Sequence, residues 1–498
     1  MRPASTTVVV PTIGRPSLHV LLRALADQDP PVDVPVVLVD DRPDGPDLRL
    51  ESDLGLDLRV LRSGGGGPAR ARNIGWRHAH TEWVSFIDDD VVPERGWYAD
   101  LQADLSTAEA AGAAGSEAHV QVPLPSDRRP TDWERGTAGL ETSCWITADL
   151  TYRRSELSRV GGFDERFPRA FREDADLALR LGGDRGRILS GVRRTIHPVR
   201  PSDDWVSVRQ QAGNADDYLM RALHGRDWWR RARAPVGRRS RHVAITLAGL
   251  AAVTGVLTRR RWIAAAGTAA WLGGTADFAW ARIAPGPRDR AEVRRMLLTS
   301  LVIPPAATYH SLRGLLSHHD VPAWRGVPDL VLLDRDGTLI EDIPYNGDPA
   351  RVLPVPGAKE ALDRLRALGV RLALVTNQSG IARGLISPDQ ADAVNTRVAD
   401  LLGPFDSVHL CPHGPEEGCA CRKPEPGMVK QACADAGVDP SRAVMIGDIG
   451  TDVAAATAAG ATGILVPTDQ TRRDEVAAAP LVAASLGEAV DRIVGGSW

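Results

Sequence analysis

Three cysteines and one histidine lie close together near residue 415 of this 498-residue chain. Cys411, His413, Cys419 and Cys421 offer three thiolates and one imidazole, the ligand set of a closed tetrahedral zinc site. Prolines and glycines between them exclude a regular helix, which leaves a loop that a metal could fold. Chance placement or a disulfide is the alternative, but the odd total of five cysteines and an N-terminus without a secretory pattern disfavour it. The spacing therefore predicts a structural zinc site.

A second group of reactive residues follows the apolar runs between residues 331 and 448. Val331–Leu333 ends in Asp334 and Asp336, of which one can attack phosphorus while the other handles the leaving-group proton. Two further runs and the segment behind the cysteine loop add hydroxyl, amide, carboxylate and basic side chains. These are Thr376, Asn377, Gln378, Ser379, Asp448, Arg422 and Lys423. Such a combination predicts a phosphoryl-transfer site.

Carboxylates also end two predicted strands in the N-terminal half. Asp40 and Asp41 close the strand around Val34–Val39, and an aspartate triplet at 88–90 closes the next buried run. Between them a glycine-rich stretch leads into a segment that delivers arginines, Arg72 among them. Because clustered carboxylates repel one another, a divalent cation is the simplest way to hold them. A diphosphate would complete the coordination shell of that cation, which could then assist departure of a leaving group.

Parallel strands are needed to bring these side chains together. Residues 6–92 alternate short apolar runs with amphipathic patterns, and the same rhythm begins again at Asp329. We therefore predict an α/β protein with Rossmann-like domains over 1–225 and 326–498, joined by a basic, apolar helical connector over 226–325. The formal net charge of −4 predicts no general affinity for nucleic acid.

The connector holds apolar runs between arginine clusters. Val243–Leu257 has 15 residues, a helix of about 22 Å, which is short of the ~30 Å hydrocarbon core. Arginines at both ends also oppose spanning. A second run covers 263–280, and a third apolar patch, Met296–Ile303, stops at Pro304-Pro305. We expect a helical hairpin on the cytoplasmic leaflet, with arginines meeting anionic lipid phosphates; packing against the catalytic domains and a short spanning hairpin are the alternatives.

In the order in which they occur, the N-terminal segments resemble an inverting family-2 glycosyltransferase of the GT-A type. The resemblance covers about residues 1–225, through residues 10–16, 39–41, 71–75, 86–90, 152–154, 161–165 and 172–177. It implies a nucleotide-sugar donor whose nucleoside contacts Asp40 and Asp41, with Arg72 near the substrate. Asp88 and Asp90 would hold Mg²⁺ or Mn²⁺ on the diphosphate.

The same resemblance implies a carboxylate base for the acceptor hydroxyl. Glu173 or Asp174 would take this role, and Asp174 is preferred. A carboxylate base suits one-step inverting displacement at the anomeric carbon. The donor sugar stays open, and so does the acceptor, which is a glycan, a lipid or a small molecule.

The C-terminal segments resemble the haloacid dehalogenase superfamily over essentially all of 328–470. This implies Asp334 as a nucleophile that forms an aspartyl-phosphate, and Asp336 as general acid and then base. Thr376 would bind the phosphoryl group and Lys423 would neutralise it. Asp448 would hold Mg²⁺ together with Asp334 and the Asp336 carbonyl, supported by Asp452.

Within that superfamily, the segment 376–384 and the cysteine loop look like those of the D-glycero-D-manno-heptose 1,7-bisphosphate 7-phosphatases. Arg422 would then contact the second phosphate or the sugar. Histidinol-phosphate phosphatases share the zinc loop and are the alternative. The chain departs from the pattern of the heptose enzymes at two places, and both bear on this choice. The residues after Thr338 differ, and Ile449 stands where a lysine is common in those enzymes.

Taken together, the motifs predict a bifunctional enzyme, a Mg²⁺-dependent sugar-bisphosphate phosphatase with a structural zinc joined to a glycosyltransferase. The alternative is that the N-terminal domain is a non-catalytic module that recruits the phosphatase. We expect the protein in the cytoplasm, with the connector at the inner face of the cell membrane.

Overall fold

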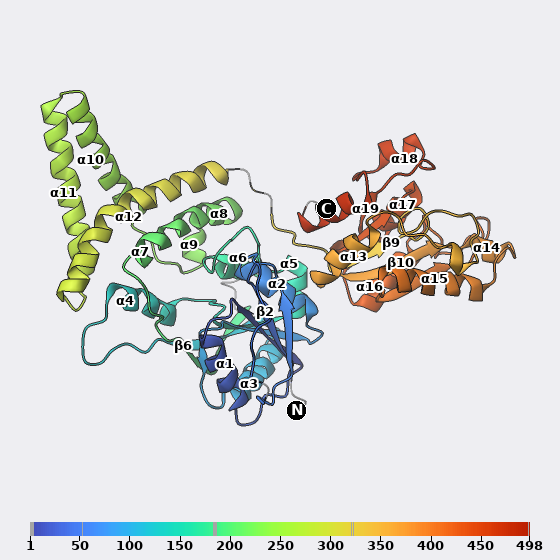
Figure 1. Cartoon of the computed structure of the whole chain (residues 1–498), viewed down its shortest axis with the longest axis horizontal. Helices are drawn as coiled ribbons and strands as arrows, with labels where there is room; N and C mark the ends of the chain where they lie inside the picture. The colour runs from blue at the N-terminus through green and yellow to red at the C-terminus, as the bar shows by residue number, and fades with distance from the viewer. Residues whose placement is uncertain (1–3, 52, 183–186, 320, 322, 497) are drawn as a thin grey trace. The chain divides into compact units, whose positions relative to one another are not determined.

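The computed structural model describes residues 4–51, 53–182, 187–319, 321, 323–496 and 498. The chain forms two compact units (Figure 1). The first contains Met1–Leu157 and Phe163–Ala323, and the second contains Ser158–Gly162 and Trp324–Trp498. Nearly all of the predicted connector thus belongs to the first unit, because its last helix packs against helices of that unit.

An eight-stranded sheet in the order β3-β2-β1-β4-β7-β6-β8-β5 forms the centre of the first unit. The first four strands in this order are parallel, and β7 pairs antiparallel with both β4 and β6. β1, β2 and β4 are buried throughout, as expected for a parallel sheet covered on both faces. The strands are β1 Thr6–Thr12, β2 Val36–Asp40, β3 Leu58–Arg62, β4 Trp83–Ile87, β5 Val92–Pro93, β6 Gly115–Gln121, β7 Asp149–Arg153 and β8 Ile188–Ile196.

Helices connect and cover these strands. α2 begins with a proline at its first position and lies so close to β1 that a Cβ on Gly75 would come within 2.3 Å of a Val9 methyl carbon. The helices are α1 Ser17–Ala26, α2 Pro68–His78, α3 Trp97–Ala110, α4 Asp132–Ala138, α5 Arg154–Val160, α6 Glu173–Arg180, α7 Val206–Arg209, α8 Asn214–His224 and α9 Trp228–Arg231.

Three long helices complete the first unit: α10 Arg239–Leu257, α11 Arg261–Ile283 and α12 Arg290–Ser317. α10 and α11 pack side by side as a hairpin, and α12 packs against both and against α8 (Figure 1). The predicted 15-residue helix is wrong in length: α10 has 19 residues and is about 28 Å long, because its first turn includes the arginines before the apolar run. α12 continues through Pro304 and Pro305, where the apolar patch stops.

The second unit is built on a five-stranded, wholly parallel sheet in the order β11-β10-β9-β12-β13. Its strands are β9 Leu330–Leu333, β10 Arg371–Asn377, β11 Ser407–Cys411, β12 Ala443–Gly447 and β13 Thr462–Leu465. Its helices are α13 Ala358–Ala367, α14 Ser379–Ala382, α15 Pro388–Leu402, α16 Gly427–Ala436, α17 Gly450–Ala459, α18 Arg473–Ala478 and α19 Leu486–Val494. The predicted α/β fold is confirmed in both units.

Parallel pairing of β9 with β10 and β12 has a direct consequence for function. The carboxyl ends of these three central strands lie at one edge of the sheet, and Asp334, Thr376 and Asp448 stand at those ends. Open α/β sheets bind ligands at this edge, so the fold gathers the predicted phosphoryl-transfer residues.

Candidate functional sites

The centre of the second unit is a buried ion-pair cluster around Lys423. Its ammonium group pairs with Asp334 and, at 2.7 Å, with Asp452, and it donates to the Val375 carbonyl at 3.0 Å. Burial alone would lower the pKa of Lys423, but the charges of Asp334 and Asp452 raise it overall. The lysine is therefore charged and is held against the predicted nucleophile.

Three carboxylates converge beside this lysine. Oxygen atoms of Asp334, Asp448 and Asp452 lie within 4.8 Å of one another, and all three residues are buried. Burial, followed by the charge of Asp452, raises the pKa of Asp448 to about 7. Gly337 faces the cluster so closely that a Cβ there would lie 2.4 Å from Asp448 Oδ2. The oxygen donor set and the excess of negative charge fit Mg²⁺.

Asp336 has different surroundings from Asp334. Its carboxylate accepts hydrogen bonds from Arg335 at 2.9 and 3.1 Å and from Gln378 Nε2 at 2.8 Å. The same Gln378 amide donates to Thr376 Oγ1 at 2.8 Å. Gln378 thus connects the predicted proton carrier to the predicted phosphoryl-binding hydroxyl.

Asn377 holds the backbone of Lys423. Its Nδ2 donates to the Lys423 carbonyl and its Oδ1 accepts from the Lys423 N–H, both at 3.1 Å. It therefore positions the lysine, whereas the sequence predicted contact with substrate. Arg422 donates to the His413 carbonyl at 3.2 Å, and Ser379 is half-buried at the start of α14.

The cysteine loop begins where β11 ends. Distances among the sulfur atoms of Cys411, Cys419 and Cys421, and from two of them to His413 Nδ1, run from 3.3 to 3.7 Å. Ligands placed about 2.0–2.3 Å from a tetrahedral centre lie about 3.5–3.8 Å apart. The four residues therefore form a site that could bind zinc, and Arg422-Lys423 follows directly after its last ligand.

The first unit has two adjoining hollows at the carboxyl ends of β1 and β4, with volumes of about 240 and 180 Å³. Both are lined by Arg72, Asp88 and Arg200. In the smaller one each aspartate of the triplet 88–90 is paired with an arginine: Asp88 with Arg72 at 2.7 Å, Asp89 with Arg15 at 2.9 Å and Asp90 with Arg200 at 2.7 Å.

Arg72 lies buried between two acids. Its Nη2 contacts Asp88 and its Nη1 contacts Glu173 at 2.9 Å, so the guanidinium already has two carboxylate partners. Arg72 thus holds two acids of the site in place and also lines both hollows, so the substrate contact predicted for it stays a prediction. Glu173 and Asp174 both line the larger hollow. Glu173 is tied to Arg72, whereas the Asp174 carboxylate accepts from the Ala175 N–H at 2.7 Å.

Both candidate bases have raised pKa values. Burial, followed by the charge of Asp174, raises the pKa of Glu173 to about 8, and burial also raises the pKa of Asp174. A raised pKa suits a group that must take a proton near neutral pH. Of the two, Asp174 has no arginine bound to it among the described residues, which favours it as the base.

The carboxylates of Asp40 and Asp41 have different partners although the two residues are adjacent in the chain. The Asp40 carboxylate is buried and bound by Arg42 at 2.6 and 2.8 Å, which lowers its pKa. Asp41 lines the smaller hollow and accepts from Ser63 and from the Gly67 N–H at 3.2 Å. Only Asp41 is therefore placed to meet a ligand in the hollow, and Asp40 fixes the turn behind it.

Several site residues were not predicted from the sequence. Arg15 and Arg200 come from segments without a strand-end pattern, and Trp133 of α4 contributes a wall of the larger hollow. Arg335 could have been predicted from the sequence, since it stands between Asp334 and Asp336 and donates to Asp336.

Comparison with known proteins divides the chain in the same way as the sequence motifs. Residues 7–171 match the family model of glycosyl transferase family 2, and residues 420–489 match a HAD-hydrolase-like model. Both enzyme activities predicted for the chain, glycosyl transfer and phosphate-ester hydrolysis, are supported by these matches.

Two curated relatives are named D-glycero-beta-D-manno-heptose-1,7-bisphosphate 7-phosphatase. The protein of Bordetella bronchiseptica is 37% identical over 149 residues, which is 29% of this chain and 83% of the relative. That of Pseudomonas aeruginosa is 39% identical over 144 residues, which is 28% of this chain and 81% of the relative. A crystal structure of the B. bronchiseptica phosphatase with magnesium and phosphate is 33% identical, covers 34% of this chain and 98% of its own, and has a TM-score of 0.31.

Proposed function

The chain belongs, through its C-terminal unit, to the family of HAD-type heptose bisphosphate phosphatases and carries a family-2 glycosyltransferase domain before it, and we propose that it performs both reactions. The phosphatase would remove the 7-phosphate of D-glycero-D-manno-heptose 1,7-bisphosphate. The transferase would move a sugar from a nucleotide-sugar with inversion. The observation that carries the proposal is the Lys423 cluster, in which a nucleophile, a cation and metal ligands meet at three strand ends.

In the proposed hydrolysis, an Asp334 carboxylate oxygen attacks phosphorus and Asp336 gives a proton to the departing sugar oxygen. Asp336, now a carboxylate held by Arg335 and Gln378, then takes a proton from water, whose oxygen attacks the aspartyl-phosphate and releases phosphate. Lys423 and the Thr376 hydroxyl would bind the phosphoryl oxygens. A bound Mg²⁺, held by Asp334, Asp448 and the Asp336 carbonyl with Asp452 beside them, would add further charge neutralisation.

Zinc is the proposed occupant of the cysteine loop, with a structural role. Its four ligands leave no open coordination position for a substrate. Folding of the loop would fix the backbone of Arg422 and Lys423, which Asn377 then anchors to β10. The metal would therefore act on catalysis through the position of these two cations.

In the proposed transfer, Asp174 takes the acceptor proton while the acceptor oxygen bonds to the anomeric carbon and the bond to the diphosphate breaks. Mg²⁺ or Mn²⁺ at Asp88 and Asp90 would neutralise the leaving diphosphate. Among the described residues these two carboxylates are not joined by a third ligand, so the ion would draw its other ligands from the diphosphate and water. Arg200, now paired with Asp90, could then move to the diphosphate.

For localisation we propose the inner face of the cell membrane. Of the 29 exposed large apolar side chains among the described residues, 17 lie on α10, α11 and α12. α10 is long and apolar enough to cross a membrane by length and composition, and 17% of its most apolar window is buried. Arginines 259–261 follow α10 directly and flank this apolar surface, which favours insertion into one leaflet over spanning.

The phosphatase proposal is tested by phosphate release from heptose 1,7-bisphosphate and from histidinol phosphate. We expect release from the heptose ester, at the 7-position, and loss of at least about 10³-fold in Asp334→Asn, since the nucleophile is removed. Release from histidinol phosphate alone would assign the chain to the other subfamily, and release from neither would refute the substrate class.

The transferase proposal is tested by hydrolysis of a panel of UDP-, GDP-, ADP- and dTDP-sugars with Mg²⁺ or Mn²⁺. Asp90→Ala should reduce cleavage of the accepted donor, and unchanged cleavage would remove the metal-site hypothesis. Binding of a glycan without cleavage of any donor by the wild type would instead favour the recruiting module.

A further inference from the structure

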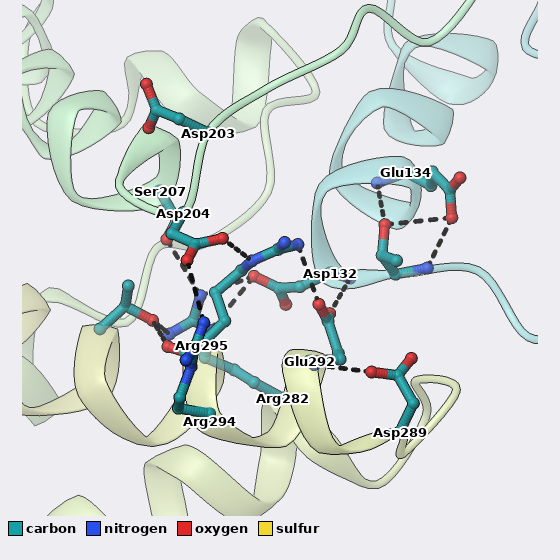
Figure 2. A network of polar contacts seen from close by, with 12 residues as sticks. Asp132, Glu134, Asp203, Asp204, Ser207, Arg282, Asp289, Glu292, Arg294 and Arg295 are labelled. Carbon is teal, nitrogen blue, oxygen red and sulfur yellow. Dashed lines mark hydrogen bonds and ion pairs between the residues drawn. The ribbon is translucent and has the colours of Figure 1, made fainter.

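Helix α4 is fastened to the long helices by a network of buried polar contacts (Figure 2). Arg282 of α11 donates to Asp132 Oδ2 from Nη2 at 2.7 Å and from Nε at 3.2 Å. Glu292 of α12 accepts from the Asp132 N–H at 2.8 Å. Arg282 and Glu292 are both buried. These contacts therefore fix the start of α4 relative to the hairpin base, the end of the α10–α11 hairpin where α10 begins and α11 ends.

The same network holds α11 against α12. Arg282 Nη1 donates to Thr299 Oγ1 at 2.8 Å and to Ser300 Oγ at 3.2 Å, and its Nη2 reaches Ser207 Oγ at 3.1 Å. Around Glu292, Arg295 donates at 3.1 Å and also binds Asp204 at 2.8 Å (Figure 2). The hairpin base and α4 are therefore positioned as one assembly.

Helix α4 separates two hollows of the first unit. Trp133, Gly136 and Thr137 line the larger transferase hollow, together with Asp174. Asp132 and Arg135 line a different hollow of about 530 Å³ at the base of the hairpin. Gln210 lines both hollows, so the two share this residue as part of their walls.

The hollow at the hairpin base is suited to an anion attached to an apolar body. Arg135, Arg238 and Arg282 line it against the single carboxylate of Asp132, which leaves an excess of positive charge. Its other walls include Phe278, Ala281, Pro285 and Ile303. An amphiphile could therefore place its anionic group beside the arginines and its apolar part against these walls.

Two polar groups in this hollow lack partners. His242 is 7% exposed, and its Nδ1 makes no hydrogen bond within the described part of the chain. Arg238, at the start of α10, is exposed and forms no ion pair among the described residues. A buried, unsatisfied ring nitrogen costs free energy unless a ligand completes its bonding.

The position of the hollow identifies the source of the anion. It is lined by residues from α10, α11 and α12, the three helices that carry most of the exposed large apolar side chains among the described residues. A second hollow, at the start of α12 and the segment before it, is lined by Arg288, Arg290, Arg294 and apolar residues and has the same mixed character. Arginines beside apolar side chains match the boundary between lipid phosphates and acyl chains.

We propose that the hollow at the hairpin base binds the phosphate of a membrane glycolipid, whose saccharide extends past Gln210 into the transferase hollow. The acceptor is then a lipid-borne sugar hydroxyl. Its oxygen bonds to the anomeric carbon of the donor, the nucleoside diphosphate leaves, and the proton goes to Asp174. This inference rests on the proposed transferase function and names its acceptor class.

Vesicle flotation of the full chain tests the phosphate site. The probes are phosphatidylcholine vesicles with phosphatidic acid, which exposes a phosphate monoester, or with oleate adjusted to the same surface potential. Wild type should bind the phosphatidic acid vesicles about tenfold more tightly, equivalent to about 1.4 kcal/mol. Arg238→Gln removes a positive charge from the hollow, and Ala281→Phe fills part of its volume. Each variant should abolish the preference for phosphatidic acid vesicles.

Matched controls separate the possible outcomes. Arg473→Gln removes an exposed arginine of the second unit, and Ala269→Phe enlarges an exposed side chain of α11; both should keep the preference. Equal binding to both vesicles, or a preference that survives both hollow variants, overturns the lipid-phosphate site. No flotation with any vesicle refutes the membrane proposal as well. If millimolar inorganic phosphate binds to the wild type but not to Arg238→Gln, and vesicle binding stays unchanged in its presence, the hollow is a soluble-anion site and the lipid assignment is overturned.

The acceptor class is tested by transfer of radiolabel from the accepted nucleotide-sugar to vesicles of the host's extracted lipids. Label should enter the organic-solvent extract, and Arg238→Gln should reduce this about tenfold while donor hydrolysis by water stays unchanged. Donor cleavage without label in the lipid phase overturns the lipid acceptor yet leaves the transferase proposal intact.

Discussion

Replacement of one metal-site carboxylate should make the magnesium-free protein more stable. Asp448 is buried beside Asp334 and Asp452, and its pKa is raised to about 7 from an ordinary value of 3.8. The folded state therefore binds a proton that the unfolded state has released, so this carboxyl destabilises the fold when it is ionised. The difference corresponds to about 4 kcal/mol.

The sign of the pH dependence follows from the same comparison. Below pH 3.8 the carboxyl is protonated in both states and has no effect on stability. As the pH rises towards 7 the unfolded state loses its proton first, so the free energy of unfolding falls, and the full penalty is present above pH 7. For this one group the penalty is about 1 kcal/mol at pH 4.5 and about 4 kcal/mol at pH 8.

Asp448→Asn keeps the shape and removes the ionisation. We expect the variant, without magnesium, to gain about 2–4 kcal/mol at pH 8, because the amide still lacks some hydrogen bonds; this is an increase of about 5–10 °C in the melting temperature of the second unit. The gain should shrink to about 1 kcal/mol or less at pH 4.5, because the same cost of the amide is set against a smaller penalty. Added Mg²⁺ should stabilise the wild type and have little effect on the variant.

The assay is thermal unfolding of the full chain after dialysis into magnesium-free buffer with micromolar Zn²⁺. Hydrogen–deuterium exchange of peptides from 443–459 assigns the shifted transition to the second unit. Asp392→Asn, an exposed position on α15, is the matched control and should not change the pH profile. A less stable Asn variant at pH 8, or one that Mg²⁺ stabilises as strongly as the wild type, would refute the reasoning.

Three further predictions concern the other groups. Cys421→Ser should lower bound zinc below one equivalent by mass spectrometry and reduce phosphate release at least tenfold, since the loop before Lys423 loses a ligand; full activity without zinc would contradict a structural role. Arg72→Met should cost about 3–5 kcal/mol in thermal unfolding because Glu173 is left buried and unpaired, and Arg72→Met/Glu173→Gln should recover part of it. Asp174→Asn should reduce sugar transfer at least 10²-fold while donor binding, measured calorimetrically, stays within threefold; equal transfer would exclude it as the base.

The zinc loop and the phosphoryl-transfer residues could be predicted because their signals are local. Cys411 and Cys421 are ten positions apart and belong to one loop, and parallel strands bring Asp334 and Asp448 to a common edge whatever the loops do. The spacing of the cysteines and the histidine was sufficient to predict the loop site, and the pattern of apolar runs was sufficient to predict the strand-end carboxylates and the fold class.

What the sequence did not reveal depends on contacts between distant segments. Arg72 pairs with Glu173 across 101 positions, and Asp132 meets Glu292 across 160. No spacing rule connects such residues, so the sequence does not show that Arg72 pairs with two acids of the site. The length of α10 was underestimated for another reason: apolar content marks the buried or lipid-facing part of a helix, whereas its charged first turn continues the same backbone hydrogen bonding.

Both candidate sites contain two more negative than positive side chains. In the second unit, among the residues that the structure describes, Lys423 is the cation paired with the cluster of Asp334, Asp448 and Asp452. In the first unit the aspartates 88–90 with Glu173 and Asp174 face Arg15, Arg72 and Arg200. In each site burial leaves a carboxyl with its pKa raised to between about 7 and about 8, which is the cost of gathering these charges without a counter-ion. The two positive charges of one divalent cation would balance either site, so the two units have the same electrostatic requirement at the carboxyl ends of their strands.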